Sequence, residues 1–574
     1  MNKHILLTLL TAFCWTTALA QESYSADQPP VGEFTITGSI QSDILIPQDD
    51  DAIGTEHVNE WGLTNTFIDI NAQSKHFDAG VRAEFKRWPL PGYEVSKKNP
   101  QFTKSSCYEG WGIPFAYMKA KWDKLDITLG SYYEQFGSGF ILRTYEERAL
   151  GIDNSLIGAR VTARPVKGVA IKDITGTQRL NWTTTKSWMT GGDLELAIDE
   201  WLPSLQKSNT HLTLGGSFLN KNEGREDIAA PNKELISYFL NVPRNVNSWD
   251  ARLSLQTGGL NILAEYAQKT QDPSFDNGYI YRPGRVAMLS ASYSSKGFSV
   301  LAQAKRSDNM SNRSVRTRNG TAAFLNHLPA FTQDQTYALA ALYPYATQPT
   351  GEWAYQGQLS YKFKKGTALG GKYGTGVSVN YSFVTGIDRN EYEPFDANHN
   401  LNPNYTKGYG SSFWKWQGGI YYQDLNVAID KKFTRDFTLK AMYMNQVFNQ
   451  QVVEKHGDII RSNIFVLDGK YRFSPKTTLR MEAQYLTTGE DQGDWIYGLA
   501  ELSLLPHFMF TLSDMYNVGG TKNHYYLGGV TFNTGSHRLM VSYGRTRAGY
   551  NCAGGVCRWI PATKGVNISY NYNF

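Results

Sequence analysis

The feature that most restricts the fold of this chain is an alternation of apolar and polar residues with a period of two. From Phe77 to Lys86, the odd positions carry Phe, Ala, Val, Ala and Phe, whereas the even positions carry Asp, Gly, Arg, Glu and Lys. The same alternation returns in residues 298–305, 464–473, 479–485 and 566–574. Successive side chains of a β-strand point to opposite faces, whereas a helix would distribute these charges around its circumference. The sequence therefore predicts a β protein whose strands are apolar on one face only.

The connections between these segments differ in length. Short ones such as 295–297 and 533–536 contain the Gly, Asn or Ser residues that hairpin turns favour, whereas long ones lie near residues 87–113, 309–351 and 384–416. Strands of about ten residues joined alternately by short turns and long loops are typical of a bacterial outer-membrane barrel. We expect a large antiparallel transmembrane β-barrel of about 24 strands (range about 20–26), with about 11 short periplasmic turns and about 12 long extracellular loops.

Three of the expected strands have a weaker alternation, those at 113–121, 167–178 and 190–199. Residues 195–205 also fit a helical period, so a short helix is the alternative for that stretch.

A soluble β-sandwich or propeller is the alternative fold, because its strands also alternate. Such folds need two packed faces and have strands of about five or six residues. The strands here are longer, and aromatic residues such as Trp61, Trp122 and Trp414 occur near their ends, where a membrane barrel carries interfacial aromatic belts. A closed sheet pairs every backbone group inside hydrocarbon and needs only one apolar face, which agrees with the low mean hydropathy. These points favour the membrane barrel.

The N-terminal residues have the features of a signal peptide. Residues 2–4 are polar and basic, an apolar stretch opens at Ile5, and Ala-Leu-Ala at 18–20 is a small-x-small cleavage pattern. A membrane anchor would need about twenty apolar residues, and threonines interrupt this stretch. We expect residues 1–20 to be removed after Ala20, residues 21–32 to form a short periplasmic segment, and residues 33–574 to form the barrel. The mature protein would then lie in the outer membrane of a diderm bacterium.

Charge and motifs argue against other function classes. Lys and Arg total 57 and Asp and Glu total 52, and this small excess gives no argument for nucleic acid as a partner. The sequence has no Gly-x-Ser-x-Gly or His-Glu-x-x-His motif, so we predict no catalytic residue, cofactor or metal, and no enzyme activity. A lipase or protease whose catalytic residues assemble across the barrel wall is the enzymatic alternative.

Two stretches approach ligand-binding motifs without completing them. Gly366–Tyr373 resembles a phosphate-binding loop, but a Tyr follows Lys372 where a hydroxyl ligand for magnesium is expected, and a strand follows instead of a helix. Asp396–Asn400 has oxygen ligands at alternating positions but lacks the Gly and the bidentate acid of a calcium loop. We expect a hairpin bend at the first stretch and a solvated loop at the second.

Cys552 and Cys557 close a small loop that contains two glycines. In an oxidising compartment this spacing predicts a local disulfide. A zinc site is the alternative, but it would need two further ligands, and no His lies nearby in sequence. The role of Cys107 stays open.

Four longer stretches carry a more specific resemblance, namely 135–154, 343–348, 367–375 and 543–574. Together they resemble an uncharacterised family of Bacteroidota outer-membrane β-barrel proteins. The resemblance implies a location and a fold but no activity, so it transfers no catalytic residue. The terminal Phe574, at the end of an alternating strand, resembles the signal that the barrel-assembly machinery reads.

The alternation predicts that a set of charged side chains faces the lumen. These are Arg82, Glu84, Lys86, Glu265, Lys305, Lys440, Lys470, Arg472, Arg480 and Glu482. Ionised groups of both signs indicate a water-filled lumen, because unpaired charges in a dry interior would be very costly. A plugged interior would satisfy them equally well if they pair closely.

The loop at 137–154 combines mixed charge with three glycines. Its charged residues are Arg143, Glu146, Glu147, Arg148 and Asp153. Such a loop, folded into the lumen, would constrict it and set opposing charges across the pore. An outward loop whose charges pair with one another is the alternative.

A second long loop carries Arg306, Arg313, Arg316 and Arg318 within a few residues. We interpret these arginines as an anion-attracting mouth or as a contact for acidic lipopolysaccharide. A solvated loop without function is the alternative.

These features predict a porin-like passive channel for polar solutes. The alternative function is a non-enzymatic surface scaffold, or a subunit of an export or envelope-assembly complex. The expected partners are outer-membrane lipid, the barrel-assembly machinery during biogenesis and, in the scaffold case, envelope proteins.

Overall fold

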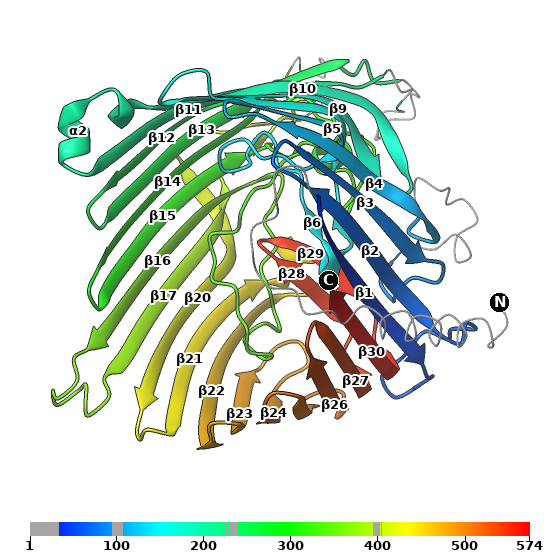
Figure 1. The fold of residues 1–574 in the computed structure, drawn as a ribbon, viewed down its shortest axis with the longest axis vertical. Helices are drawn as coiled ribbons and strands as arrows, with labels where there is room; N and C mark the ends of the chain where they lie inside the picture. The colour runs from blue at the N-terminus through cyan, green and yellow to red at the C-terminus, as the bar shows by residue number, and fades with distance from the viewer. Residues whose placement is uncertain (1–33, 94–106, 225–227, 229–238, 394–401, 403) are drawn as a thin grey trace.

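A single closed sheet of 24 antiparallel strands forms the wall of the molecule (Figure 1). The computed structural model describes residues 34–93, 107–224, 228, 239–393, 402 and 404–574. The first twelve wall strands are β1 (Thr35–Pro47), β2 (Leu63–Gln73), β3 (Phe77–Lys86), β4 (Gly110–Lys121), β5 (Leu125–Tyr132), β8 (Leu156–Ala163), β9 (Val169–Leu180), β10 (Thr183–Ala197), β11 (Thr210–Asn222), β12 (Asn245–Thr257), β13 (Leu260–Lys269) and β14 (Gly284–Ser295). The others are β15 (Phe298–Asp308), β16 (Gly351–Phe363), β17 (Thr375–Ile387), β20 (Trp416–Lys432), β21 (Phe437–Asn449), β22 (Ile459–Ser474), β23 (Thr477–Thr488), β24 (Trp495–Leu504), β25 (Phe508–Asn517), β26 (His524–Thr534), β27 (His537–Thr546) and β30 (Thr563–Asn573).

The barrel closes where β1 pairs with β30. Register partners run from Ser39 with Asn573 to Pro47 with Gly565, and the backbone N–H of Phe574 donates to the carbonyl of Gly38 at 3.0 Å. Every wall strand therefore has two neighbours, and no sheet edge is left open. The predicted fold class and strand number are confirmed.

The remaining elements are short and lie in the connections. They are β6 (Glu146–Glu147) paired with β7 (Ile152–Asp153), β18 (Asn390–Glu391) paired with β19 (Tyr409–Gly410), β28 (Gly549–Ala553) paired with β29 (Val556–Ile560), η1 (Arg148–Leu150), η2 (Ile198–Glu200), α2 (Pro203–Lys207), η3 (Phe275–Asn277), η4 (Tyr405–Lys407) and α3 (Gln450–Val453). In the part of the chain that the structure describes, no helix is long and apolar enough to cross a membrane.

The register of neighbouring strands confirms the predicted alternation. Asp69 of β2 faces Arg82 of β3, and both side chains point into the barrel. Val81 and Phe85, on the opposite face of β3, are exposed. Strands of this pattern present an apolar surface outwards and polar groups inwards.

The two ends of the barrel differ. At the end where residues 74–76 join β2 to β3, which we name the short-turn end, most connections are short. The opposite end, which we name the long-loop end, carries the connections 48–62, 87–109, 133–155, 309–350 and 388–415.

Connections at both ends depart from this expected division. Asn181 and Trp182 join β9 to β10 by a tight turn at the long-loop end, where Asn181 adopts a positive φ of 53°. At the short-turn end, η2 and α2 lie between β10 and β11, and Figure 1 shows α2 beyond the ends of the strands. The helical alternative for residues 195–205 is therefore correct only from Pro203, since Glu195 still belongs to β10.

Some predictions cannot be compared with this structure. The signal peptide, the segment 21–32 and the calcium-like stretch Asp396–Asn400 lie outside the described residues. They stay predictions.

Candidate functional site

The lumen of the barrel is the candidate site, because three chain segments fold into it from the long-loop end. They are the connection 133–155, the connection 309–350 and the hairpin β28–β29, and Figure 1 shows β6, β28 and β29 within the ring of strands. Phe140 and Leu142 of the first segment and Leu325 and Leu339 of the second are completely buried. Loops that bury such side chains are packed against other parts of the protein and are not solvated.

An apolar patch on the inner wall receives the segment 309–350. Met444, Phe448 and Ile464 point inwards from β21 and β22 and are fully buried. The ring of Tyr343 stacks on Phe448 with 5.7 Å between the ring centroids. The backbone N–H of Leu339 donates to the side-chain oxygen of Gln484, a wall residue, at 2.8 Å. Fully burying one such side chain stabilises by about 1.5–3 kcal/mol, so this patch fixes the segment to the wall.

The two long segments also bind each other through their backbones. The N–H of Arg143 donates to the carbonyl of Leu325 at 2.7 Å, and the N–H of His327 donates to the carbonyl of Gly139 at 2.9 Å. The side-chain amide of Asn326 donates to two further carbonyls, of Phe140 and Met310. The segments therefore form one unit, which we call the plug, consisting of residues 133–155 and 309–350.

A network of buried charges connects the first plug segment to the wall. Arg82 of β3 contacts Asp69 at 2.6 Å, Glu146 at 2.9 Å and Asp153 at 3.3 Å. Arg148 contacts the same Asp69 at 2.9 Å and Glu146 at 2.7 Å. Two of the five predicted constriction residues, Glu146 and Asp153, thus form ion pairs with the predicted luminal charge Arg82, and a third, Arg148, pairs with Asp69 and Glu146.

The network continues along the wall. Glu84 accepts hydrogen bonds from Lys86 at 2.8 Å and from Arg179 of β9 at 2.8 Å, and Arg179 also contacts Asp153 at 2.5 Å. Glu84, Lys86 and Arg179 are all buried. In the long-loop half, the luminal charges are therefore satisfied by close pairing with one another. This arrangement agrees with the alternative prediction of a plugged lumen.

The other predicted constriction residues have different surroundings. The Arg143 guanidinium lies over the ring of Tyr145 at 4.9 Å, and a carboxylate oxygen of Glu147 accepts from the N–H of Ala149 at the start of η1. Glu265, on the wall, accepts from the N–H of Ser138 at 3.0 Å and so holds the tip of the first segment. None of these contacts tests a constriction during transport, which stays a prediction.

The second plug segment is anchored at both ends by buried ion pairs. Lys305 and Glu352, both completely buried, lie 2.9 Å apart, and Glu352 also accepts from the hydroxyl of Tyr345 and from the backbone of Gln348. Arg316 contacts Glu223 at 3.0 Å. These pairs fix the segment where it leaves and re-enters the wall.

The interpretation of the arginine-rich loop as an open anion-attracting mouth is wrong. Arg306, Arg313 and Arg316 are at most 3% exposed, and Arg313 contacts Asp276 at 2.8 Å. Only Arg318 keeps partial exposure. Acidic residues from neighbouring connections, which no single-sequence pattern associates with this loop, neutralise most of the cluster.

The short-turn half of the lumen is different in character. Lys470 and Arg472 are exposed on the inward face of β22, with Arg472 2.7 Å from Asp436. Arg480 contacts Asp468 at 3.0 Å and also pairs with Glu482. Further inward-facing ionised residues in this half are Asp78, Lys119, Lys121, Asp126, Asp430, Lys440 and Glu501.

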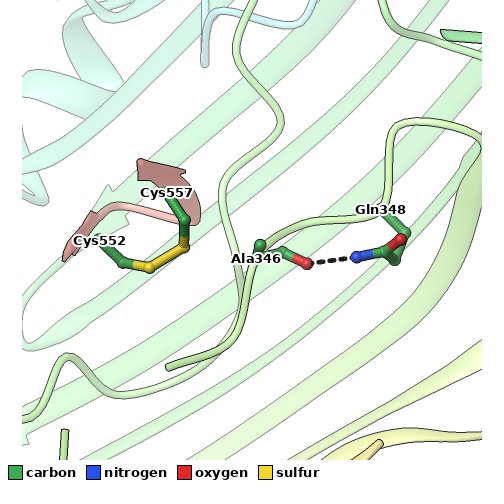
Figure 2. Close-up of a disulfide and its surroundings, with 4 residues drawn as sticks. All are labelled: Ala346, Gln348, Cys552 and Cys557. Atoms are coloured by element: carbon green, nitrogen blue, oxygen red, sulfur yellow. Dashed lines mark hydrogen bonds between the residues drawn. A yellow bond between two sulfur atoms is a disulfide. The ribbon is translucent and has the colours of Figure 1, made fainter. Parts of the chain in front are cut away.

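The tip of the hairpin β28–β29 contacts the plug. Cys552 and Cys557 form a disulfide across it, as predicted, and Figure 2 shows this disulfide beside the chain at Ala346 and Gln348. The carbonyl of Gly555 accepts from the N–H of Thr347 at 3.0 Å. A Cβ at Gly555 would lie 2.5 Å from the hydroxyl of Thr347, so glycine permits this close approach.

Burial changes the titration of one plug residue. His327 is 7% exposed, and its burial, together with the positive charges of Arg143 and Lys305, lowers its pKa to about 3. The imidazole is therefore neutral at neutral pH.

A cavity of about 380 Å³ lies beside the plug, between it and the wall formed by β1, β2 and β30. Its lining is mixed, with apolar side chains such as Leu45 and Phe67 beside polar ones such as Gln41, Asn65 and Arg148. This space is large enough for small polar solutes.

The stretch that resembles a phosphate-binding loop forms a bend. Gly366–Tyr373 forms the connection between β16 and β17, and Gly371 has a positive φ of 59°, as a bend requires. Among the described residues, no group of three or more His, Cys, Asp or Glu side chains is arranged to hold a metal ion.

Sequence reasoning missed the wall partners Asp69 and Arg179, the anchor Glu352 and the apolar inner patch. A signal for the patch was present, because Ile464 and Val466 stand at inward positions of a strand that otherwise carries charge there. The apolar content of residues 323–345 was the matching signal on the loop.

Comparison with known proteins gives a family and a set of structures with low similarity. A profile described as a family of unknown function, DUF6029, matches residues 1–574. No curated protein matches the chain.

Several solved structures are similar to the chain at low identity. The siderophore receptor PirA from Pseudomonas aeruginosa is 8% identical, with 96% of this chain and 81% of that chain covered and a TM-score of 0.40. The translocation pore of the P pilus usher PapC is 9% identical, with 94% and 99% covered and a TM-score of 0.43. OccAB2 from Acinetobacter baumannii is 9% identical, with 95% and 98% covered and a TM-score of 0.35.

Proposed function

The chain belongs to a family of unknown function, DUF6029, so its activity has to be inferred from its geometry, and we propose that it is an outer-membrane channel for polar solutes whose lumen is closed by a folded plug. The closed ring pairs the wall backbone internally, and its outward face is apolar, as hydrocarbon requires. The long-loop end would face the cell exterior and the short-turn end the periplasm. Phe574 would serve as the assembly signal.

The observation that carries the proposal is the contrast between the two halves of the lumen. A ring of 24 strands is too wide for wall side chains alone to fill. In the short-turn half, its inward face carries exposed ionised groups such as Lys470. In the long-loop half, the plug and its ion pairs occupy much of the space and leave cavities such as the one beside β1. A wet lumen behind a seated plug supports a conduit that opens when the plug moves.

Planar-bilayer conductance of the refolded barrel tests this proposal. Asn309 and Thr350 are joined by a backbone hydrogen bond of 3.2 Å, so residues 311–348 can be replaced by Gly-Ser-Gly without stretching the wall. We expect the intact barrel to give small or rare openings and the excised barrel to give steady openings of several-fold larger conductance. A control with residues 200–207 replaced by Gly-Ser-Gly shortens the connection at the opposite end and should behave as the intact barrel.

The excised barrel must first show the heat-modifiable mobility of a folded barrel on a gel. If a folded, excised barrel conducts no ions, the channel proposal is wrong, and the scaffold alternative, with envelope proteins as partners, takes its place.

A further inference from the structure

A cluster of arginines lies on the outside of the barrel wall, near the long-loop end. Arg306 and Asp308 of β15 alternate with the inward Lys305 and Ser307, and Arg306 pairs in register with Trp353 of β16. Arg285 of β14 pairs in register with Asp308. These side chains therefore occupy the face of the sheet that is otherwise apolar and exposed.

Residues 409–415 fold against this face and complete the cluster. The Arg306 guanidinium lies 4.5 Å from the ring centroid of Phe413, and its Nη2 donates to the hydroxyl of Ser411 at 2.7 Å. The indole N–H of Trp353 donates to the carbonyl of Lys415 at 3.3 Å. The cluster is thus a built feature of the outer wall and not a set of unrelated surface residues.

Tyr409 contacts two further cations of the cluster, Arg282 and Arg389. Its ring lies between the guanidinium of Arg282, 4.1 Å from the centroid, and that of Arg389, 4.7 Å from the centroid. Its hydroxyl donates to Asp308 at 2.7 Å, and Asp308 also accepts from Arg282 at 2.7 Å.

Positive charge exceeds negative charge among the described residues of the cluster. The cations are Arg282, Arg285, Arg306, Arg389 and Lys415, and the anions are Asp308 and Asp388. Arg306 is 1% exposed, and among the described residues its Nε and Nη1 have no hydrogen-bond acceptor. Asp308, 3.7 Å from Nη1 of Arg306, is shared with Arg282, so the cluster keeps surplus positive charge that an anionic group at its exposed side, beside Arg285 and Lys415, would offset.

The height of the cluster on the wall indicates the source of that anion. Arg306 lies eight residues along β15 from Phe298 at the short-turn end, about 20 Å along the barrel axis for a strand tilted by about 40°. The lipid-facing band of such barrels is about 25 Å tall, so Arg306 lies near its outer border. Trp414 and Trp416, which are 80% and 57% exposed, lie beside it as an interfacial aromatic girdle would.

We propose that this cluster binds the phosphate of a lipid head group in the outer leaflet. The exposed guanidinium of Arg285 binds phosphate oxygens in bidentate fashion, and the exposed ammonium of Lys415 contacts the phosphate as a point charge. Arg282 and Arg306, held behind them, add a positive field, and Trp414 and Trp416 pack against the lipid below. The site rests on the proposed membrane placement of the barrel but not on its conducting ions.

Native mass spectrometry of the detergent-solubilised barrel, titrated with diphosphoryl lipid A, tests the site. The double variant Arg285→Gln/Lys415→Gln removes both exposed cations. We expect its binding to be about 30-fold weaker, because each surface cation contributes about a factor of five to attraction toward an anionic membrane surface. The control Lys296→Gln/Lys365→Gln removes two exposed charges at the opposite rim and should bind as the wild type does.

Two further arms distinguish the source of the phosphate. The wild type should bind dephosphorylated lipid A no more tightly than the double variant binds diphosphoryl lipid A. Inorganic phosphate at millimolar concentration should not displace diphosphoryl lipid A from the wild type. Equal binding by the wild type and the double variant, or full displacement by inorganic phosphate, would overturn the proposal. Conductance measured on the same preparations keeps the two proposals separate, because a silent barrel that binds the lipid contradicts only the channel.

Discussion

Glu352 is the single residue on which the seating of the second plug segment most depends. It is the carboxylate partner of the completely buried Lys305, and it accepts hydrogen bonds from Tyr345 and Gln348. In Glu352→Gln the ammonium of Lys305 stays buried without its counter-charge. Breaking a buried pair in this way costs about 3–5 kcal/mol. We expect faster hydrogen exchange of residues 337–348 while the barrel stays folded.

Glu195→Gln is the matched control for this substitution. Glu195 contacts Arg252 at 3.0 Å but is 41% exposed, and exposed pairs contribute less than about 1 kcal/mol. Its exchange pattern in the plug should equal that of the wild type. Unchanged exchange in Glu352→Gln would contradict the anchoring role.

His327 makes the plug sensitive to acid. Its pKa in the seated plug is about 3, below the value of about 6.5 for an exposed histidine, so a released segment binds a proton more readily than the seated one. The free energy that favours the seated plug is therefore fully present above pH 6.5, where the imidazole is neutral in both states. It falls as the pH drops from 6.5 toward 3, because the released segment binds a proton and the seated one does not. At pH 4.5 the loss reaches at most about 2.5 kcal/mol.

Proteolysis of the segment 309–350 measures this effect. We expect cleavage to be faster at pH 4.5 than at pH 7 in the wild type, using a protease whose activity on a peptide standard is calibrated at both pH values. His327→Gln, which is neutral at both, should show no such acceleration. An equal acceleration in the variant would place the sensitivity elsewhere.

At this scale, sequence reasoning gave orientation but not partners. The alternation placed Arg82, Glu84 and Lys86 on the inward face, and the structure agrees. Their partners Asp69 and Arg179 come from β2 and β9, and Asp153 comes from the plug, so only the closed ring and the inward fold bring them together. Local periodicity carries no information about such contacts.

Among the elements, the hairpin β28–β29 contacts the plug through its tip, where Gly555 accepts from Thr347, and through β28, which lies beside η1. The disulfide between Cys552 and Cys557 closes a loop of five residues in sequence separation, and closing so short a loop stabilises by about 2 kcal/mol. We expect Cys552→Ala/Cys557→Ala to leave the wall intact but to increase the frequency of channel openings, because the hairpin would hold Thr347 less firmly.

A reductant gives the control for the disulfide prediction. Adding it to the wild type should reproduce the behaviour of the double variant, and adding it to the double variant should change nothing further. If the opening frequency is the same with and without the disulfide, the hairpin does not restrain the plug.

The strands were predictable from sequence to a greater extent than their connections. Alternation located β3, β15, β22, β23 and β30 because half of every strand faces lipid and half faces polar surroundings. The course of residues 309–350 was not predictable, because a long loop shows no period. Only its apolar residues, such as Leu325 and Leu339, indicated burial, and they did not identify the wall patch that buries them.

In the whole molecule, backbone hydrogen bonds run continuously around the wall, whereas the interior is occupied by separate chain segments held largely by side-chain contacts. Hydrogen bonding closes the wall through β1 and β30, which makes the ring independent of the plug. The plug in turn depends on side-chain contacts with the wall, so it can move while the ring stays intact. This separation would allow the proposed channel to open while the barrel wall stays intact. The matching profile shows the family, and the closed sheet shows the fold. The taxon that the resemblance suggests stays a prediction.

Thiol labelling of single cysteines on the inward face of the wall tests this account most directly. In a Cys107→Ser background, Lys470→Cys lies in the short-turn half and Met444→Cys lies beneath the plug. A charged, membrane-impermeant methanethiosulfonate reagent should label Lys470→Cys rapidly, and should label Met444→Cys only after residues 311–348 are excised. Equally rapid labelling of both positions in the intact barrel would contradict the account.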